Sequence, residues 1–454
     1  MSIHTSHPVT LPGADELRAL LVGALVLPQD PDWPRAATPW NVTVRAQPLA
    51  VVEAANPADV AAAVAHAAAH GIRVALIGPG HGASETIGGT LLIRTSGLRR
   101  LEISQPTGTA IVGAGVTWGE LQAALAGTAL TGLVGSSPSV SVVGLLLQGG
   151  YSWFTRSFGA AAGSLRAAEV VDSSGERRWV DDMTDAELMW GLRGGGGRFA
   201  AITTVEIDLF PVGSLAGGRL MFPIDDIEAV VGAFADVTRH APRDVSVWVS
   251  ALHFPPLPEL PDAVRGRSFV VVDAVATTGV DALNQELRPI RAAGTVLRDT
   301  IASRGPEGIA EICEEPVTPT PALQRGIALG GLSEGAVSAF LAAATTPGPF
   351  MSLQLRHLAG SPKLRDGVAT AIAADYVVNA LAITPVPPAE EAARAAMDAL
   401  AETLAPWSGG AVLPSFVATW RSLADACAPE QLERLAAVRR RVDPDGIFTA
   451  SLRG

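Results

Sequence analysis

The chain reads VALIGPGHGAS over residues 74–84, a short apolar run followed by a turn that holds three glycines and one histidine. The apolar run, residues 74–77, predicts a short buried strand. Glycine lets the backbone adopt positive φ and approach a ligand closely, because no Cβ stands in the way. Successive exposed N–H groups in such a turn form a concave site for anions such as phosphates. This stretch therefore predicts a strand that ends in an anion-binding loop, with His81 in its middle.

A predicted helix with typical start and stop residues precedes this strand. Asn56 can cap its N-terminus, Pro57 suits its first turn, and Gly71 ends it. A strand-like segment at residues 49–53 comes directly before the helix. The order strand, helix, strand and glycine turn is typical of an α/β nucleotide-binding unit.

Two further glycine-rich segments follow along the chain. The second loop, GSSPSVS at residues 135–141, leads through an apolar run to Gly149 and Gly150. The third, RGGGGRF at residues 193–199, precedes an alternating strand at residues 201–209. Packing alone does not easily explain three such turns, each at the edge of a predicted strand. Together they predict one long, anionic ligand that is bound largely by backbone groups.

Composition narrows the classes of protein that this chain can belong to. With 454 residues, of which 48% are hydrophobic and 17% charged, we expect a folded protein of more than one domain. A net charge of −12 argues against binding to nucleic acid or to an anionic membrane surface. The only lysine, Lys363, forms no phosphate-loop motif, and the two cysteines have no metal-binding spacing. We therefore expect no bound metal.

The N-terminal residues and the apolar runs predict the compartment. Residues 1–30 have no basic start followed by a long apolar run, so we expect no signal peptide. No uncharged apolar run reaches the length of a membrane span. The chain is therefore predicted to be cytoplasmic.

Beyond Pro211 the sequence changes character. Alanine-rich helical segments alternate with short strands; the helices are expected at 227–240, 280–294, 333–344 and 390–404, and the strands include 245–252, 268–274 and 351–357. An arginine-rich helix is expected from residue 429. This pattern predicts a separate α+β domain in which helices cover one face of an antiparallel sheet.

Four blocks of the sequence carry a family resemblance. They are GPGH at 78–81, PSVSVVG at 138–144, LRGGGGRFA at 192–200 and RLAAVRRRVDPDGIF at 434–448. In this order they resemble the berberine-bridge-enzyme-like FAD-dependent oxidoreductases of the vanillyl-alcohol-oxidase superfamily. The resemblance implies an α+β fold, with a two-part PCMH-type FAD-binding domain and a substrate domain. It places the FAD-binding domain at 1–212, the substrate domain at 213–407, and a segment that returns to the FAD domain at 408–454.

The resemblance also implies FAD as the cofactor and assigns the residues that bind it. They are Gly78, Pro79, Gly80, His81, Gly82, Ala83, Ser136, Ser137, Ser139, Val140, Val143, Gly144, Gly149, Gly150 and Ile202. In this family the histidine of the first loop attaches to the 8α-methyl of the flavin, and a neutral imidazole is a competent nucleophile for such a bond. Many members add a cysteine bond from the second loop, where this chain has Ser137. We therefore expect a link through His81 only.

The substrate side departs from the family pattern. The family often places a tyrosine, and a Tyr-x-Asn strand, over the flavin, but the corresponding strand predicted here, residues 409–416, has neither. The catalytic candidates are Tyr376, Tyr151 and His357, with His253 as a further base candidate. Each also fits a structural role, and a tyrosine base would need its high pKa lowered by neighbours.

Two functions follow from this resemblance. The first is an FAD-dependent oxidase or dehydrogenase in secondary metabolism, in which a small organic substrate gives a hydride to flavin N5 and molecular oxygen reoxidises the flavin. The second is a redox-neutral flavoprotein that catalyses a cyclisation or only binds a small molecule. In either case we expect a monomer or homodimer that binds neither nucleic acid nor membrane.

Overall fold

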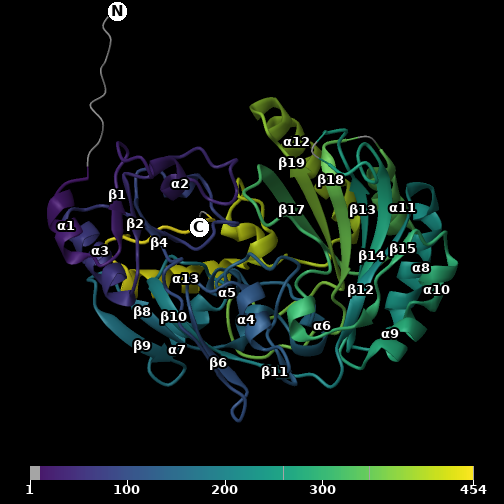
Figure 1. The fold of residues 1–454 in the computed structure, drawn as a ribbon, viewed down its shortest axis with the longest axis horizontal. Coiled ribbons are helices and arrows are strands. Elements are labelled where there is room, and N and C mark those ends of the chain that lie inside the picture. Colours follow the sequence, from purple (N-terminus) through teal and green to yellow (C-terminus); the bar gives the residue numbers. More distant parts are fainter. Residues whose placement is uncertain (1–10, 259, 347, 453–454) are drawn as a thin grey trace, which may run out of the picture.

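The computed structural model describes residues 11–258, 260–346 and 348–452. In Figure 1 two smaller sheets lie on one side of the molecule and a large sheet lies on the other, with helices along its outer face. The predicted α+β class is confirmed. Among the residues described, no helix combines the length and the apolar character needed to cross a membrane.

The first sheet contains the strand that leads into the glycine loop of residues 78–84. Its strands run in the order β1 (Ala24–Val26), β2 (Ala50–Glu53), β4 (Leu91–Arg94) and β3 (Val74–Ile77). Strands β2, β4 and β3 are parallel, and α3 (Pro57–Ala69) connects β2 to β3. Asn56 caps α3 by accepting hydrogen bonds from the N–H groups of Ala58 and Asp59, as the sequence predicts. The glycine loop thus follows the carboxyl end of a parallel strand.

The second sheet is antiparallel. Its order is β5 (Leu101–Ser104), β6 (Thr109–Gly113), β10 (Ala201–Asp208), β8 (Leu165–Val171) and β9 (Arg177–Asp181). Around it lie α4 (Trp118–Ala124), α5 (Val142–Leu146), α7 (Ala186–Leu192) and α13 (Pro429–Val442). After α13 the chain returns to the first sheet, because the Val74 N–H donates to Ile447 and the Thr449 N–H donates to Val74.

The third sheet is also antiparallel and builds the second half of the molecule. Its order is β15 (Arg298–Asp299), β12 (Ala216–Pro223), β14 (Ser268–Ala276), β13 (Val245–His253), β18 (Phe350–His357), β19 (Tyr376–Ile383) and β17 (Ala322–Leu329). The helices of this half are α8 (Ile227–His240), α9 (Val280–Glu286), α10 (Arg288–Ala292), α11 (Glu334–Thr345) and α12 (Pro387–Leu404). The remaining short elements are α1 (Ala14–Leu20), α2 (Trp33–Ala37), β7 (Leu130–Thr131), α6 (Thr155–Phe158), β11 (Phe210–Pro211) and β16 (Ala302–Ser303).

The two faces of the third sheet pack against different parts of the molecule. Successive side chains of a strand point to opposite faces. Val378 and Ala380 join the core beneath the helices, whereas Val377 packs with the core of the first half, which contains the first and second sheets. Trp248 on β13 also belongs to the latter core. One face of the sheet is therefore turned to the helices and the other to the first half (Figure 1).

Two sequence predictions about elements are wrong. The predicted strand at 409–416 is an irregular segment ending in a 3₁₀ turn at Pro414–Phe416, because proline offers no N–H to a sheet ladder. The predicted helix at 280–294 is split into α9 and α10 at Leu287, two residues before Pro289. In a helix interior, the Pro289 ring would clash with the preceding turn, which accounts for the break.

Candidate active site

Segments that are far apart in the sequence meet beyond the carboxyl end of β3. The imidazole Nε2 of His81 lies 2.9 Å from the Ser139 hydroxyl in the second loop. The Ser84 hydroxyl donates to the Ser451 carbonyl at 2.7 Å, and the Gln148 amide donates to the Ser451 hydroxyl at 2.8 Å. The first loop, the second loop, the turn at residue 148 and the C-terminal segment therefore form one cluster.

Two glycines of these loops differ in the space around them. Gly80 has φ of 96°, and a Cβ there would stand 2.7 Å from the Cβ of Pro39, so a side chain would be strained and crowded. Gly197, in the third glycine turn, is half-buried, yet apart from its chain neighbours no described atom lies within 4 Å of where its Cβ would stand. A half-buried turn that faces open space fits a backbone cradle for an extended phosphate ligand such as FAD.

His81 is held as a neutral imidazole. Its ring stacks on Trp40 with the centroids 4.0 Å apart. Burial lowers the pKa of His81 to about 4, and the hydrogen bond with Ser139 opposes this shift only in part. The Ser139 hydroxyl is itself 3.1 Å from the Ser137 hydroxyl. One ring nitrogen is thus engaged by a serine pair, and the ring carries no charge at neutral pH.

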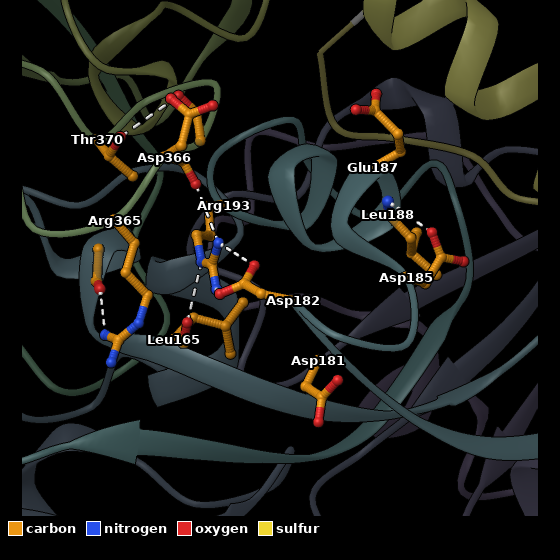
Figure 2. A network of polar contacts seen from close by, with 12 residues as sticks. Leu165, Asp181, Asp182, Asp185, Glu187, Leu188, Arg193, Arg365, Asp366 and Thr370 are labelled. Carbon is orange, nitrogen blue, oxygen red and sulfur yellow. Dashed lines mark hydrogen bonds and ion pairs between the residues drawn. The ribbon is translucent and has the colours of Figure 1, made fainter.

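A buried arginine anchors the third glycine turn. Arg193 directly precedes Gly194, and its guanidinium donates to both carboxylate oxygens of Asp182 at 2.8 Å each (Figure 2). It also donates to the carbonyls of Leu165 on β8 and of Asp366 in the loop before β19. A Cβ on Gly194 would lie 2.3 Å from the Cβ of Ala369 in that same loop. The glycine turn is therefore fixed between both halves of the molecule.

The third sheet presents polar side chains to these loops. Ser250, Gln354 and Asn379 are register partners across β13, β18 and β19. In the next row Arg356 pairs with Trp248, and its guanidinium lies 3.9 Å from the centre of that ring. Figure 1 shows these strands between the first half and the outer helices. Because Trp248 packs with the core of the first half, this polar row faces the loops.

Tyr151 lies within this interface. Its hydroxyl accepts a hydrogen bond from the Leu413 N–H at 3.0 Å, and its ring meets Phe416 edge-on at 4.8 Å. Burial raises the pKa of Tyr151 well above its ordinary value. The phenol is therefore protonated at neutral pH and suited to donate a hydrogen bond rather than to remove a proton.

The other catalytic candidates lie on the helix-covered face of the third sheet. The Tyr376 hydroxyl is 2.8 Å from the Thr238 hydroxyl on α8, and its ring belongs to the core beneath the helices. His357 stacks on Tyr376 at 5.2 Å, and burial lowers its pKa to about 3. Among the described residues, neither of its ring nitrogens has a hydrogen-bond partner. His253 hydrogen-bonds within its own domain. The structure thus brings Tyr151 to the loops but places Tyr376 and His357 on the helix-covered face.

Three more predicted cofactor residues lie in regular elements. Val143 and Gly144 lie in the first turn of α5, where the Gly144 N–H donates to the Ser141 hydroxyl. Ile202 lies near the start of β10 and pairs with Val170. Over the ranges that the structure describes, no group of three or more histidine, cysteine or acidic side chains is arranged to hold a metal.

A pocket of about 460 Å³ opens beside this interface. It lies between α13, the loop before β19 and the segment at 411–413, and Ala369 and Leu413 line it. A Cβ on Gly149 would stand 3.0 and 3.2 Å from the Cβ atoms of these two residues. One layer of side chains, Ala369 and Leu413, therefore separates the pocket from the turn at Gly149.

Sequence reasoning missed the polar row on the third sheet. Its signal is the alternation Ser352, Gln354 and Arg356 in a strand whose intervening positions are leucines. That alternation indicates a polar face and an apolar face. Only the packed structure shows that the polar face meets the first half of the molecule rather than solvent.

Comparison with known proteins agrees with this arrangement. Residues 48–181 match the FAD binding domain family. The FAD-dependent monooxygenase tpcD of Cochliobolus heterostrophus is 32% identical over 212 residues, which is 45% of this chain and 41% of that protein. The aligned region thus spans less than half the length of the first relatives, and the same share holds for the FAD-dependent monooxygenase FUP4 of Fusarium proliferatum.

Other similarities extend over nearly the whole chain. The (R)-6-hydroxynicotine oxidase of Paenarthrobacter nicotinovorans is 24% identical over 94% of this chain and 95% of its own length. The solved structure of BBE-like 1 from Physcomitrella patens superposes with a TM-score of 0.83, at 16% identity, over 96% of this chain and 98% of that one. This chain therefore carries an FAD-binding domain on the fold of the berberine-bridge-enzyme-like, PCMH-type FAD-linked oxidoreductases.

Proposed function

We propose that this protein is an FAD-dependent oxidoreductase that oxidises a small organic substrate, in secondary metabolism, and that holds its FAD through His81. The observation that carries this proposal is the meeting of the glycine loops and the C-terminal segment around a neutral histidine. The printed activities of the relatives, a monooxygenase and a hydroxynicotine oxidase, support redox chemistry on a small molecule. When bound, FAD would supply an acceptor for a substrate hydride at N5, with molecular oxygen as the final oxidant.

The first loop and its neighbours would hold the cofactor. The N–H groups of the turn at Gly80 would bind the pyrophosphate. The hydrogen bond to Ser139 would hold one nitrogen of His81 and leave the lone pair of the other nitrogen as the nucleophile toward the flavin 8α-methyl. The new C–N bond would replace a methyl C–H bond, with release of the proton and transfer of two electrons to the flavin, from which molecular oxygen would remove them. Cys313 and Cys427 are buried free thiols, and Cys313 contacts the Asp273 carboxylate on the third sheet. We therefore propose no thioether link.

The third sheet and Tyr151 would orient the substrate. The phenol of Tyr151 and the guanidinium of Arg356 are hydrogen-bond donors on the side that faces the loops. The aromatic rings of Trp248 and Phe416 pack against Arg356 and would exclude water from the reacting atoms.

A direct test is anaerobic mixing of the purified, FAD-loaded protein with a panel of small alcohols and amines. The proposal predicts that at least one compound bleaches the visible flavin band and that admitted oxygen restores it. A flavin that dithionite reduces, but that no member of a broad panel reduces, would argue against the proposal.

The state of the candidate bases favours a second candidate function, a redox-neutral flavoprotein in which FAD shapes the pocket. On the loop-facing side, the Asp273 carboxylate is paired with Arg219 at 2.6 and 2.9 Å. Burial raises the pKa of Tyr151, so its phenol stays protonated at neutral pH and does not remove a proton. The expected tyrosine and asparagine are absent from residues 409–416. Under this alternative, a substrate is converted without oxygen uptake, which an oxygen electrode measures during turnover.

A further inference from the structure

Arg356 occupies an unusual position on the loop-facing side of the third sheet. Its side chain is buried, with 4% of the residue exposed. Its Nε donates to the Gln354 side chain and its Nη2 donates to the Ser136 hydroxyl at 3.3 Å. These two acceptors are neutral, and within the described ranges no carboxylate forms an ion pair with Arg356. A buried charge without a counter-charge is costly unless a ligand supplies one.

The other buried arginines are of two kinds. Arg193 and Arg219 each bind both oxygens of an aspartate. Arg156 and Arg198, like Arg356, have only neutral acceptors, but all of theirs are backbone carbonyls. Arg356 differs from both kinds, because its two acceptors are side chains on the loop-facing side of the third sheet. Only part of the donor capacity of Arg356 is used, because a guanidinium carries five N–H groups.

The carboxylate of Asp273 is not free to balance Arg356. Asp273 and Arg356 are both register partners of Trp248, so the indole lies between them in the same row of the sheet. Asp273 is already held by Arg219 on its far side. Glu315 and Asp273 favour the charged form of Arg356 from a distance, and within the described ranges neither forms an ion pair with it. Burial raises the pKa of the Cys313 thiol, so this group carries no balancing charge. The row therefore leaves a net positive charge at Arg356.

The surroundings of Arg356 add acceptors and flat apolar walls. The Asn379 amide oxygen and the Ser415 hydroxyl are buried, and neither has a hydrogen-bond partner among the described residues. Asn379 is the register partner of Gln354, the residue that receives the Nε of Arg356. The rings of Trp248 and Phe416 lie 3.9 and 5.0 Å from the guanidinium carbon. A complementary ligand has an anionic group, a hydrogen-bond donor and a flat body.

We infer that Arg356 binds a carboxylate of the substrate, so that the substrate class is a small aromatic or otherwise flat organic acid. The guanidinium N–H groups left free by Gln354 and Ser136 donate to the carboxylate oxygens. The unpartnered oxygen of Asn379 accepts a hydrogen bond from a hydroxyl or amine on the same molecule. This inference rests on the proposed function, because it takes the loop-facing side of the sheet as the substrate side.

The test uses the purified full chain loaded with FAD, with flavin content measured first. Benzoate is the anionic probe and benzamide is its neutral counterpart; binding is followed by calorimetry and by the change in the flavin spectrum. We expect the native protein to bind benzoate at least about tenfold more tightly than benzamide. We expect R356Q to weaken benzoate binding at least about tenfold and to leave benzamide binding unchanged.

Two further variants complete the design. R356K keeps the charge and is expected to retain most of the benzoate affinity that R356Q loses. R298Q removes an exposed arginine that pairs with Glu314 in the same domain, and its benzoate affinity is expected to stay within about twofold of native.

The outcomes separate this inference from the proposed function. A flavin-loaded native protein that does not prefer benzoate over benzamide overturns the inference and leaves the proposed function standing. Unchanged benzoate binding in R356Q, together with a lowered flavin potential, also overturns it and assigns Arg356 to the cofactor. A protein that takes up no FAD contradicts the proposed function, and the calorimetric comparison of the two probes still tests Arg356.

Discussion

Burial controls the charge of two histidines that the sequence singled out, His81 and His357. It lowers the pKa of His81 to about 4 and that of His357 to about 3, since both rings lose the water that would stabilise the imidazolium. In His81 a neutral ring beside Ser139 fits the role of a nucleophile. In His357 the neutral ring stacks on Tyr376 under the helices, where it fits a packing role.

Replacing His357 tests this reading of its pKa. Between pH 6.5 and 5 the unfolded chain binds a proton that the folded chain does not, so the free energy of unfolding falls as pH falls. We expect H357F to remove about 1.5 kcal/mol of that decline. We also expect unchanged FAD content and turnover, because the ring lies on the helix-covered face. Urea unfolding at a series of pH values measures the slope; an unchanged slope or lost turnover contradicts the account.

Ser139 offers a second test at this scale. We expect S139A to form the flavin link at least about tenfold more slowly, because the His81 ring loses the partner that fixes its tautomer and orientation. S137A is the matched control, since Ser137 contacts Ser139 but makes no hydrogen bond with His81. The time course of intact mass after FAD is added to the apoprotein measures the rate. Equal rates for S139A and the native protein would show that Ser139 does not position the ring.

At the scale of elements, local signals predicted the frame of the FAD-binding half. Asn56 caps α3 as the sequence predicts, because this contact lies within one turn of the chain. The segment at 409–416 was mispredicted as a strand since tertiary packing decides its path. A Cβ on Gly409 would lie 2.4 Å from the carbonyl carbon of Leu329, so this segment crosses β17 closely rather than extending the sheet.

The same contrast applies to the candidate site. The first loop could be predicted because the backbone freedom of glycine and the reactivity of histidine are properties of the residues themselves. The polar row of Gln354, Arg356 and Asn379 was not, because strand alternation shows that two faces exist without showing what covers each one.

The third glycine turn gives a prediction about an element. Gly197 and Gly232, the latter in α8, are both half-buried, and a Cβ at either would meet no atom within 4 Å. We expect G197A to keep native stability but to weaken FAD binding at least about tenfold, because its methyl would enter the cradle. We expect G232A to leave FAD binding unchanged and to stabilise the helix by about 0.5–1 kcal/mol. Equal FAD affinities in the two variants would place the cofactor elsewhere.

At the scale of the whole molecule, the two halves interlock through buried polar contacts. Arg156, on α6 of the FAD-binding half, donates to the carbonyls of Ala241, Pro242, Val245 and Ala359 in the second half. Arg193 likewise reaches the carbonyl of Asp366. These contacts hold the third sheet against the loops, so the site depends on the assembly of both halves.

Replacing Arg156 tests whether these hydrogen bonds couple the two halves. We expect R156A to lower the free energy of unfolding by at least about 3 kcal/mol, because it leaves several buried carbonyls without a donor. R298Q, at an exposed ion pair, is the control and is expected to change stability by less than about 1 kcal/mol. Urea unfolding followed by tryptophan fluorescence measures both; equal small effects would show that Arg156 does not couple the halves.

The central claim is that the meeting loops hold FAD and that His81 binds it covalently. Its most direct test is the intact mass of the denatured protein, after purification and incubation with FAD, compared between the native chain and H81A. The account predicts a chain that carries the added mass of one FAD, and an H81A chain that binds FAD when folded but releases it on denaturation. A native chain that shows no added mass and takes up no FAD when folded would contradict the account.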